Sequence, residues 1–145
     1  METRPMPESA YYKERDRYRA DTLLNYLKRN HDTLSDIILA LTTHDISTSK
    51  GNIKDYGIMG LGFNPGNVCI VSSYRLSKDT KSQKQISNRF IKVVLHELGH
   101  NFGLTHCTYS KTCYMQDAEG SIKTIDRSEK YLCENCRKHL ILNEQ

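Results

Sequence analysis

The sequence predicts a single α+β domain, and three observations support this prediction. The chain has 145 residues, a length that suits one domain with a buried core. Short apolar segments between residues 36 and 74 have the length and turn-rich borders of strands. A longer segment, from about Gln83 to Asn101, has its apolar residues at helical spacing. We therefore expect one domain over residues 1–145.

The N-terminal part is predicted to hold a helix. Residues 1–10 contain two prolines and no apolar pattern, so we expect them to be disordered. A first helix is expected from about Tyr12 to Lys28, because the leucines within residues 23–27 form an apolar stripe. The mixed charges of residues 13–17 are interpreted as its solvated face, and nucleic-acid binding by this run is the less favoured alternative.

Three apolar segments are predicted to be strands. Residues 36–42 form a short buried strand, and the polar residues 44–51 after it are expected to be a loop. Residues 57–63 and 68–74 are two further strands. Pro and Gly lie at the centre of the segment between them, residues 64–67, so a type II turn is expected to join them as a hairpin.

The strand predicted over residues 57–63 contains three glycines. Glycines weaken the side-chain packing of a strand and allow another backbone to come close. At a sheet edge, such a strand offers open N–H and C=O groups to which a peptide can add as a further strand. The alternative, held equally, is that the glycines fit a tight bend or bulge.

The long helix ends in the motif H-E-x-x-H-x-x-G-x-x-H. Residues four apart lie on one face of a helix, so His96 and His100 can direct two imidazoles at one ion. Glu97 lies about 60° from His100 around the helix, too far round to be a ligand but close enough to contact a water on the metal. Gly103 can adopt a left-handed conformation that ends the helix and returns the chain, which brings in His106.

Three neutral imidazoles with one open position describe a catalytic zinc site. Zinc lowers the pKa of its water toward about 7, and Glu97 is predicted to take the proton of that water and pass it to the leaving amine. The alternative is that these are ordinary surface histidines, which the added glycine and third histidine disfavour. His31 and His139 stand alone and are interpreted as ordinary histidines without a functional role. His44 is interpreted as a solvated loop residue, with a functional role near the cleft as the weaker alternative.

Four of the five cysteines form two pairs, Cys107 with Cys113 and Cys133 with Cys136. Two thiolate pairs can bind a tetrahedral structural zinc. Disulfides are the alternative, but the N-terminus lacks the apolar core of a secretion signal, which predicts a cytoplasmic, reducing setting. Cys69 lies within a predicted strand and is expected to be a buried core residue.

The segment after the cysteine pair holds further candidates. Met115 is expected to form a soft apolar floor beneath the three histidines, and the alternative is a methionine that only fills a gap in the core. Residues 116–124, with a turn at Glu119–Gly120, are expected to form a wall of the substrate pocket. Asp126 and Glu129 resemble a capping box for a last helix that reaches about Leu142.

Together these motifs resemble the archaemetzincins, a metzincin-like family of zinc metallopeptidases. In that family the zinc motif runs into a cysteine, then C-x-M, seventeen residues and C-x-x-C, and seventeen residues do separate Met115 from Cys133 here. The residues that carry the resemblance are His96, Glu97, His100, Gly103, His106, Cys107, Cys113, Met115, Cys133 and Cys136. Two features depart from the family pattern: five residues rather than four separate Cys107 from Cys113, and residues 1–11 offer no strand before the first helix.

The resemblance implies a metzincin-like zincin, with a small twisted mixed β-sheet, an active-site helix and a C-terminal helix carrying a four-cysteine zinc site. It implies two zinc ions per chain, one catalytic and one structural. The implied roles are the catalytic-zinc ligands His96, His100 and His106, the general base Glu97, the structural-zinc ligands Cys107, Cys113, Cys133 and Cys136, and the Met-turn residue Met115.

The predicted function is therefore a zinc metallopeptidase that acts on peptides or proteins. The alternative is a non-catalytic zinc module that binds protein or nucleic acid. Glu97 argues against this alternative, because a purely structural metal site does not need a base beside an open metal position. A third possibility is a gluzincin with Glu119 or Glu129 as third ligand, and a zinc ribonuclease is disfavoured. The formal net charge of +4 argues only weakly for an anionic partner, and no apolar run is long enough to span a membrane.

Overall fold

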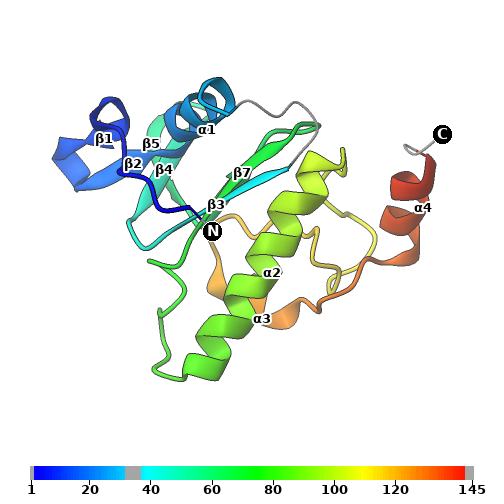
Figure 1. Cartoon of the computed structure of the whole chain (residues 1–145). Coiled ribbons are helices and arrows are strands. Elements are labelled where there is room, and N and C mark those ends of the chain that lie inside the picture. The colour runs from blue at the N-terminus through cyan, green and yellow to red at the C-terminus, as the bar shows by residue number, and fades with distance from the viewer. Residues whose placement is uncertain (1, 32–36, 143–145) are drawn as a thin grey trace.

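The computed structural model in Figure 1 describes residues 2–31 and 37–142. The combination of helices with mixed β-sheets confirms the α+β class. The described strands form two small sheets, however, and not the single sheet that was expected. One sheet has the order β1 (Tyr11–Tyr12), β2 (Arg17–Arg19), β4 (Ile46–Lys50) and β5 (Ile53–Ile58). The other has the order β3 (Ile38–Thr42), β7 (Val68–Ser72) and β6 (Gly60–Gly62). The α-helices are α1 (Ala20–Arg29), α2 (Gln83–Asn101), α3 (Ile122–Arg127) and α4 (Glu134–Leu142).

Strand β7 separates the two main parts of the core. Val68 and Ile70 pack with Leu23 and Leu24 of α1 in one buried cluster. Val71 points to the opposite side, as alternation along a strand requires, and packs with Val93 of α2 in a second cluster. Figure 1 shows α1 and α2 on opposite sides of this strand. The sheet thus supports α2, the helix that carries the histidine motif, from one side.

The predicted first helix is wrong in its first half. Helix α1 begins only at Ala20, because the residues before it form a 3-10 helix (Lys13–Arg15) and strand β2. Asp16 has a left-handed φ of 48°, which interrupts any helix, and β2 then pairs in parallel with β4. Strand β2 also supplies the strand before the first helix that the sequence did not reveal. Of residues 2–10, which were expected to be disordered, Glu8–Ala10 form a 3-10 helix and Ala10 is buried.

The strand expected over residues 36–42 is confirmed as β3, while Asp36 lies outside the described residues. It is not buried on both faces, because Leu39 and Leu41 are exposed. The loop predicted over residues 44–51 is wrong, since Ile46–Lys50 form β4. The strand is held by backbone pairing on both sides, in parallel with β2 and antiparallel with β5, which does not require apolar side chains.

The predicted hairpin is confirmed in part. Strands β6 and β7 pair antiparallel, but Gly57 and Ile58 belong to β5 in the other sheet. The chain changes sheets at Met59, whose carbonyl accepts a hydrogen bond from Ser72 N at 2.8 Å. The type II turn is wrong, because Gly66 is not among the glycines with positive φ and the Asn64–Pro65 peptide bond is cis.

The bounds predicted for the long helix are confirmed by α2. The Ser82 side chain accepts a hydrogen bond from Gln85 N and caps its N-terminus. Beyond its C-terminus, Gly103 has a φ of 86°, the left-handed conformation expected of it. None of the helices in the described part of the chain is long and apolar enough to cross a membrane.

The capping box proposed at residues 126–129 is wrong. Asp126 lies inside α3 and accepts two hydrogen bonds of 2.7 Å from the guanidinium of Arg89 on α2. The hydrogen bond that Arg89 donates to Asp126 is the main cause of a raised pKa of Arg89 and of a lowered pKa of Asp126. The contact fixes α3 against α2, and the last helix, α4, begins later, at Glu134.

Candidate active site and metal centres

Three histidine side chains converge at the C-terminal end of α2. His96 and His100 come from α2, and His106 comes from the segment that returns after Gly103. The Nε2 atom of His100 lies 3.1 Å from Nε2 of His96 and 3.2 Å from Nε2 of His106. Two nitrogens bound to one tetrahedral zinc at about 2.0–2.1 Å lie about 3.3 Å apart. The spacing of this histidine triad (His96, His100 and His106) therefore fits a single ion.

Each ring of the histidine triad is oriented through its other nitrogen. His96 Nδ1 donates to Tyr114 O at 2.7 Å, and His100 Nδ1 donates to Leu104 O at 2.7 Å. Because a carbonyl can only accept, these bonds place the hydrogen on Nδ1 and leave the Nε2 lone pair for a metal. Burial, reinforced by the charge of His100, lowers the pKa of His96 to about 4, so this ring is neutral at neutral pH.

Glu97 is buried next to the histidine triad and lines the same cavity. Burial raises the pKa of Glu97 to about 8 in the metal-free chain. The glycine at position 60 makes room for this side chain, since a Cβ atom there would lie 2.6 Å from Glu97 Oε1. A Cβ at Gly62 would lie 2.9 Å from the Glu97 carbonyl, so this glycine lets the backbone of α2 approach β6. The close approach expected of the glycine-rich strand is thus confirmed.

Met115 is fully buried beneath α2. A Cβ added to Gly99 would lie 2.3 Å from Met115 Sδ, so the sulfur packs directly on α2 at a position between His96 and His100 in the sequence. Its carbonyl accepts a hydrogen bond from Cys107 N at 2.8 Å. Met115 is thus packed against the helix that carries His96 and His100, and its role as a floor beneath all three histidines stays a prediction.

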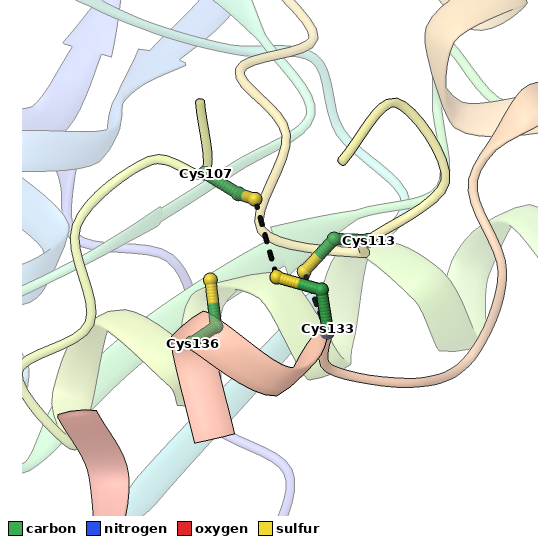
Figure 2. Close-up of side chains that lie close together, drawn as sticks. All are labelled: Cys107, Cys113, Cys133 and Cys136. Atoms are coloured by element: carbon green, nitrogen blue, oxygen red, sulfur yellow. Dashed lines mark hydrogen bonds between the residues drawn. The ribbon is translucent and has the colours of Figure 1, made fainter. Parts of the chain in front are cut away.

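The four cysteines Cys107, Cys113, Cys133 and Cys136 also converge, as Figure 2 shows. Their sulfur atoms all lie within 4.8 Å of one another, and none of them is joined in a disulfide. Cys107 Sγ lies 3.6 Å from Cys133 Sγ. Sulfurs at about 2.3 Å from a tetrahedral zinc lie about 3.8 Å apart, so this cysteine cluster fits one ion, and the five-residue spacing between its first two members does not prevent the approach.

The two sites are joined through short backbone contacts. His106 and Cys107 are adjacent in sequence, and Gln116 Nε2 donates to Cys107 O at 3.0 Å. Together with the bond from Cys107 N to Met115 O, this contact ties the third histidine to the Met115 turn. A structural change at the cysteine cluster can therefore alter the position of His106 in the histidine triad.

A cavity of about 340 Å³ opens beside the histidine triad. One wall comes from β6, the end of β5 and the β4 residues 48–50, and the other comes from the loop of residues 116–120 and α3. The wall expected over residues 116–124 is thus present, but its last three residues belong to α3 rather than to a loop. The loop contains the predicted turn, with positive φ at Glu119 and Gly120. Tyr56 of β5 donates its hydroxyl to Glu119 O at 2.7 Å, which ties the loop to the opposite wall.

The remaining candidates lie apart from the metal centres. His44 does not line the cavity but packs edge-on against Tyr18, with ring centroids 5.2 Å apart. His139 Nδ1 donates to Asn135 O at 3.0 Å within α4. Cys69 is a fully buried core residue, as predicted. Neither Glu119 nor Glu129 belongs to a metal-ligand group among the described residues, which argues against the gluzincin alternative.

Two residues that orient the histidine triad were not found from the sequence. The Asp117 carboxylate lies 3.4 Å from His106 Nδ1, and Asn64 Nδ2 donates to Leu104 O at 2.9 Å and lies 3.3 Å from His100 Nδ1. Both lie in loops, where nothing in the local sequence indicates a partner. Only the proximity of Asp117 to the cysteine and methionine motif, two residues after Met115, gave a usable signal.

Comparisons with known proteins agree with this geometry. The model of peptidase family M54 matches residues 3–141. The archaemetzincin of Halobacterium salinarum is 32% identical over 140 residues, which cover 92% of this chain and 76% of that protein. The crystal structure of the archaemetzincin of Methanopyrus kandleri superposes with a TM-score of 0.82 at 33% identity, over 96% of this chain and 72% of that one. A zinc-dependent peptidase from Methanocorpusculum labreanum gives a TM-score of 0.72 at 26% identity, over 93% of this chain and 80% of that one.

These matches confirm the resemblance that the zinc motif, the cysteine spacing and Met115 indicated. The chain belongs to peptidase family M54, the archaemetzincins, and is a zinc-dependent peptidase.

Proposed function

We propose that this peptidase binds its catalytic zinc through the histidine triad and uses Glu97 as the general base. The observation that carries the proposal is that Glu97 and all three histidines line one cavity. The Nε2 spacing and the Nδ1–H donors favour three neutral imidazole ligands. We further propose that the cysteine cluster binds a second, structural zinc and that Met115 is the Met-turn residue, which makes two zinc ions per chain.

Zinc bound by the triad supplies a Lewis acid that polarises the substrate carbonyl and lowers the pKa of a water. Glu97 accepts the proton of the attacking water on a carboxylate oxygen and later donates it to the leaving amine. The buried setting of Glu97 excludes bulk water from this carboxyl, so its proton is transferred within the site. Family membership favours this reaction over the non-catalytic zinc module.

The substrate is proposed to lie along β6. This strand ends its sheet in the described part of the chain, and all three of its residues line the cavity. An extended peptide can pair with the open N–H and C=O groups of such an edge. This arrangement places the peptide between β6 and the loop of residues 116–120.

The cytoplasmic location of the protein stays a prediction.

The test compares wild type with Glu97→Gln, both loaded with zinc. A mixture of unblocked decapeptides is incubated with each protein, and cleavage is followed by mass spectrometry, which detects both end trimming and internal cuts. We expect Glu97→Gln to keep two zinc ions by elemental analysis and to lose about a hundredfold or more in rate. Equal rates for the two zinc-loaded proteins would refute Glu97 as the general base.

A further inference from the structure

The cavity extends from the histidine triad along α2 to Lys92. Lys92 and His96 are four residues apart and line the same cavity, together with Val93 between them. One helical turn, about 5.4 Å along the helix axis, separates the backbone positions of Lys92 and His96, so the two residues border neighbouring parts of the cavity. The wall that faces Lys92 here is the end of α3, where Ile125 and Ser128 also line the cavity.

The Lys92 ammonium is buried and only partly satisfied. Its Nζ donates to Ile125 O at 2.9 Å and to Asp126 O at 3.2 Å. An ammonium group has three N–H donors, so these two bonds leave one donor for another acceptor. Only 7% of the residue is exposed, so the side chain as a whole is largely shielded from bulk water.

Lys92 also has no carboxylate partner among the ion pairs of residues 2–31 and 37–142. The nearby Asp126 carboxylate is occupied by Arg89, which holds both of its oxygens at 2.7 Å. The other charges around Lys92 are Glu129, which favours its charged form, and Lys130, which opposes it. Burial is the main cause of a lowered pKa of Lys92, as expected where an anion is missing. A buried cation at a cavity wall is stabilised by an anion that enters the cavity.

We propose that Lys92 determines substrate specificity by binding the carboxylate of a glutamate or aspartate side chain next to the scissile bond. This inference rests on the proposed function of the histidine triad and names the substrate class of that same site: peptides with an acidic residue at the cut. The apolar side chain of Val93 lines the path to Lys92, so the methylene groups of glutamate suit it better than the shorter aspartate.

A purely structural role for Lys92 makes a different prediction. Its two carbonyl acceptors lie in the last turn of α3, where a cation stabilises the helix terminus. If that were its whole role, Lys92 would affect the stability of the fold but not the choice between charged and neutral substrates. Substrate charge therefore separates the two roles.

The first experiment measures cleavage of paired decapeptides that differ only by glutamate or glutamine at the residues flanking the cut. We expect wild type to favour the glutamate peptide by about tenfold in kcat/KM, as one charge-assisted hydrogen bond allows. Lys92→Met should abolish this preference, so that the ratio of kcat/KM for the two peptides falls to about one. Lys92→Arg should retain part of the preference. Lys84→Met, which removes an exposed lysine of the same helix outside the cavity, is the matched control and should behave as wild type.

A second experiment keeps the inference testable without turnover. Binding of the pentapeptide Ala-Ala-Glu-Ala-Ala and of its glutamine counterpart to zinc-loaded Glu97→Gln is measured by calorimetry. Tighter binding of the glutamate peptide, lost when Lys92→Met is added, supports Lys92 even if no peptide is cleaved and the general-base proposal fails. Equal binding of the two peptides overturns the Lys92 proposal, whatever the rates. If Lys92→Met does not fold, Lys92→Gln keeps a donor for the α3 carbonyls without the charge and replaces it in both experiments.

Discussion

The Asp117 carboxylate lies 3.4 Å from Nδ1 of His106, on the edge of the ring away from the Nε2 atom that faces His100. The two other triad histidines are oriented by backbone carbonyls, which no side-chain substitution can remove. Asp117 is therefore the one described side chain that orients a triad histidine through a carboxylate. His106 also differs from the other two in being exposed and in coming from a loop rather than from α2.

We expect Asp117→Asn to weaken zinc binding at the histidine triad by about tenfold, because a carboxylate that holds an imidazole fixes the orientation of its ring toward the metal. The effect falls at the lower end of the usual range because the Asp117 side chain is 41% exposed. Competition with a chromogenic chelator measures the affinity. Glu119→Gln changes an acidic residue of the same loop that has no histidine contact, and its affinity should equal that of wild type. An unchanged affinity in Asp117→Asn would mean that the loop orients His106 without this carboxylate.

Metal content tests the number and the place of the ions. We expect two zinc ions per chain in wild type and about one in His106→Ala, since two imidazoles hold zinc far less well than three. Elemental analysis after dialysis gives the count. One zinc in both proteins would show that the triad does not retain zinc during isolation, and two in both would show that another residue completes the site.

The link between the two metal centres can be tested at Cys133, which lies in the cysteine cluster and far in sequence from the triad. Cys133→Ala removes one thiolate, so we expect the cluster to lose its zinc. The segment around Cys107 should then loosen, and because it carries His106 and bonds Met115 O, zinc affinity at the triad should also fall. Chelator competition resolves the two sites as separate steps.

Cys69→Ala is the control for that experiment, because it removes a buried thiol outside the cluster. It should leave both affinities unchanged. A Cys133→Ala protein whose triad binds zinc as tightly as wild type would show that the two centres are independent.

The site could be predicted from the sequence where its geometry is local. His96 and His100 are fixed by the period of one helix, and the left-handed Gly103 returns the chain within three residues. The bounds of α2 were predictable for the same reason, since its apolar spacing and the Ser82 cap lie within one segment. The cysteine cluster could be predicted because its cysteines occur in two closely spaced pairs, a pattern that indicates a metal site in many different folds.

The errors lie where distant segments decide the local structure. Asp126 has the spacing of a capping residue, but the buried guanidinium of Arg89 holds it inside α3. The polar sequence of β4 does not resemble a strand, yet it pairs on both sides, with β2 and with β5. A lysine in a helix is usually solvated, and Lys92 is buried only because α3 packs over it.

Stability of the metal-free protein should depend on pH through Glu97. Burial raises the pKa of this carboxyl from 4.5 to about 8 in the folded chain, so between these values the folded state holds a proton that the unfolded state has released. The folding stability that comes from this group is therefore full below about pH 4.5 and is lost as pH rises to about 8, by up to about 1.4 kcal/mol per pH unit.

Glu97→Gln removes the titrating group, so the metal-free variant should lose much less stability than metal-free wild type between pH 6 and pH 8.5. Urea unfolding of both proteins in the presence of a chelator at these two pH values measures the difference. His96 titrates in the opposite sense: burial lowers its pKa from 6.5 to about 4, so its contribution is lost as pH falls through that range and is common to both proteins. If the two proteins lose equal stability toward alkaline pH, the carboxyl is not held protonated in the buried site, and its proton affinity in the folded chain is close to that in water.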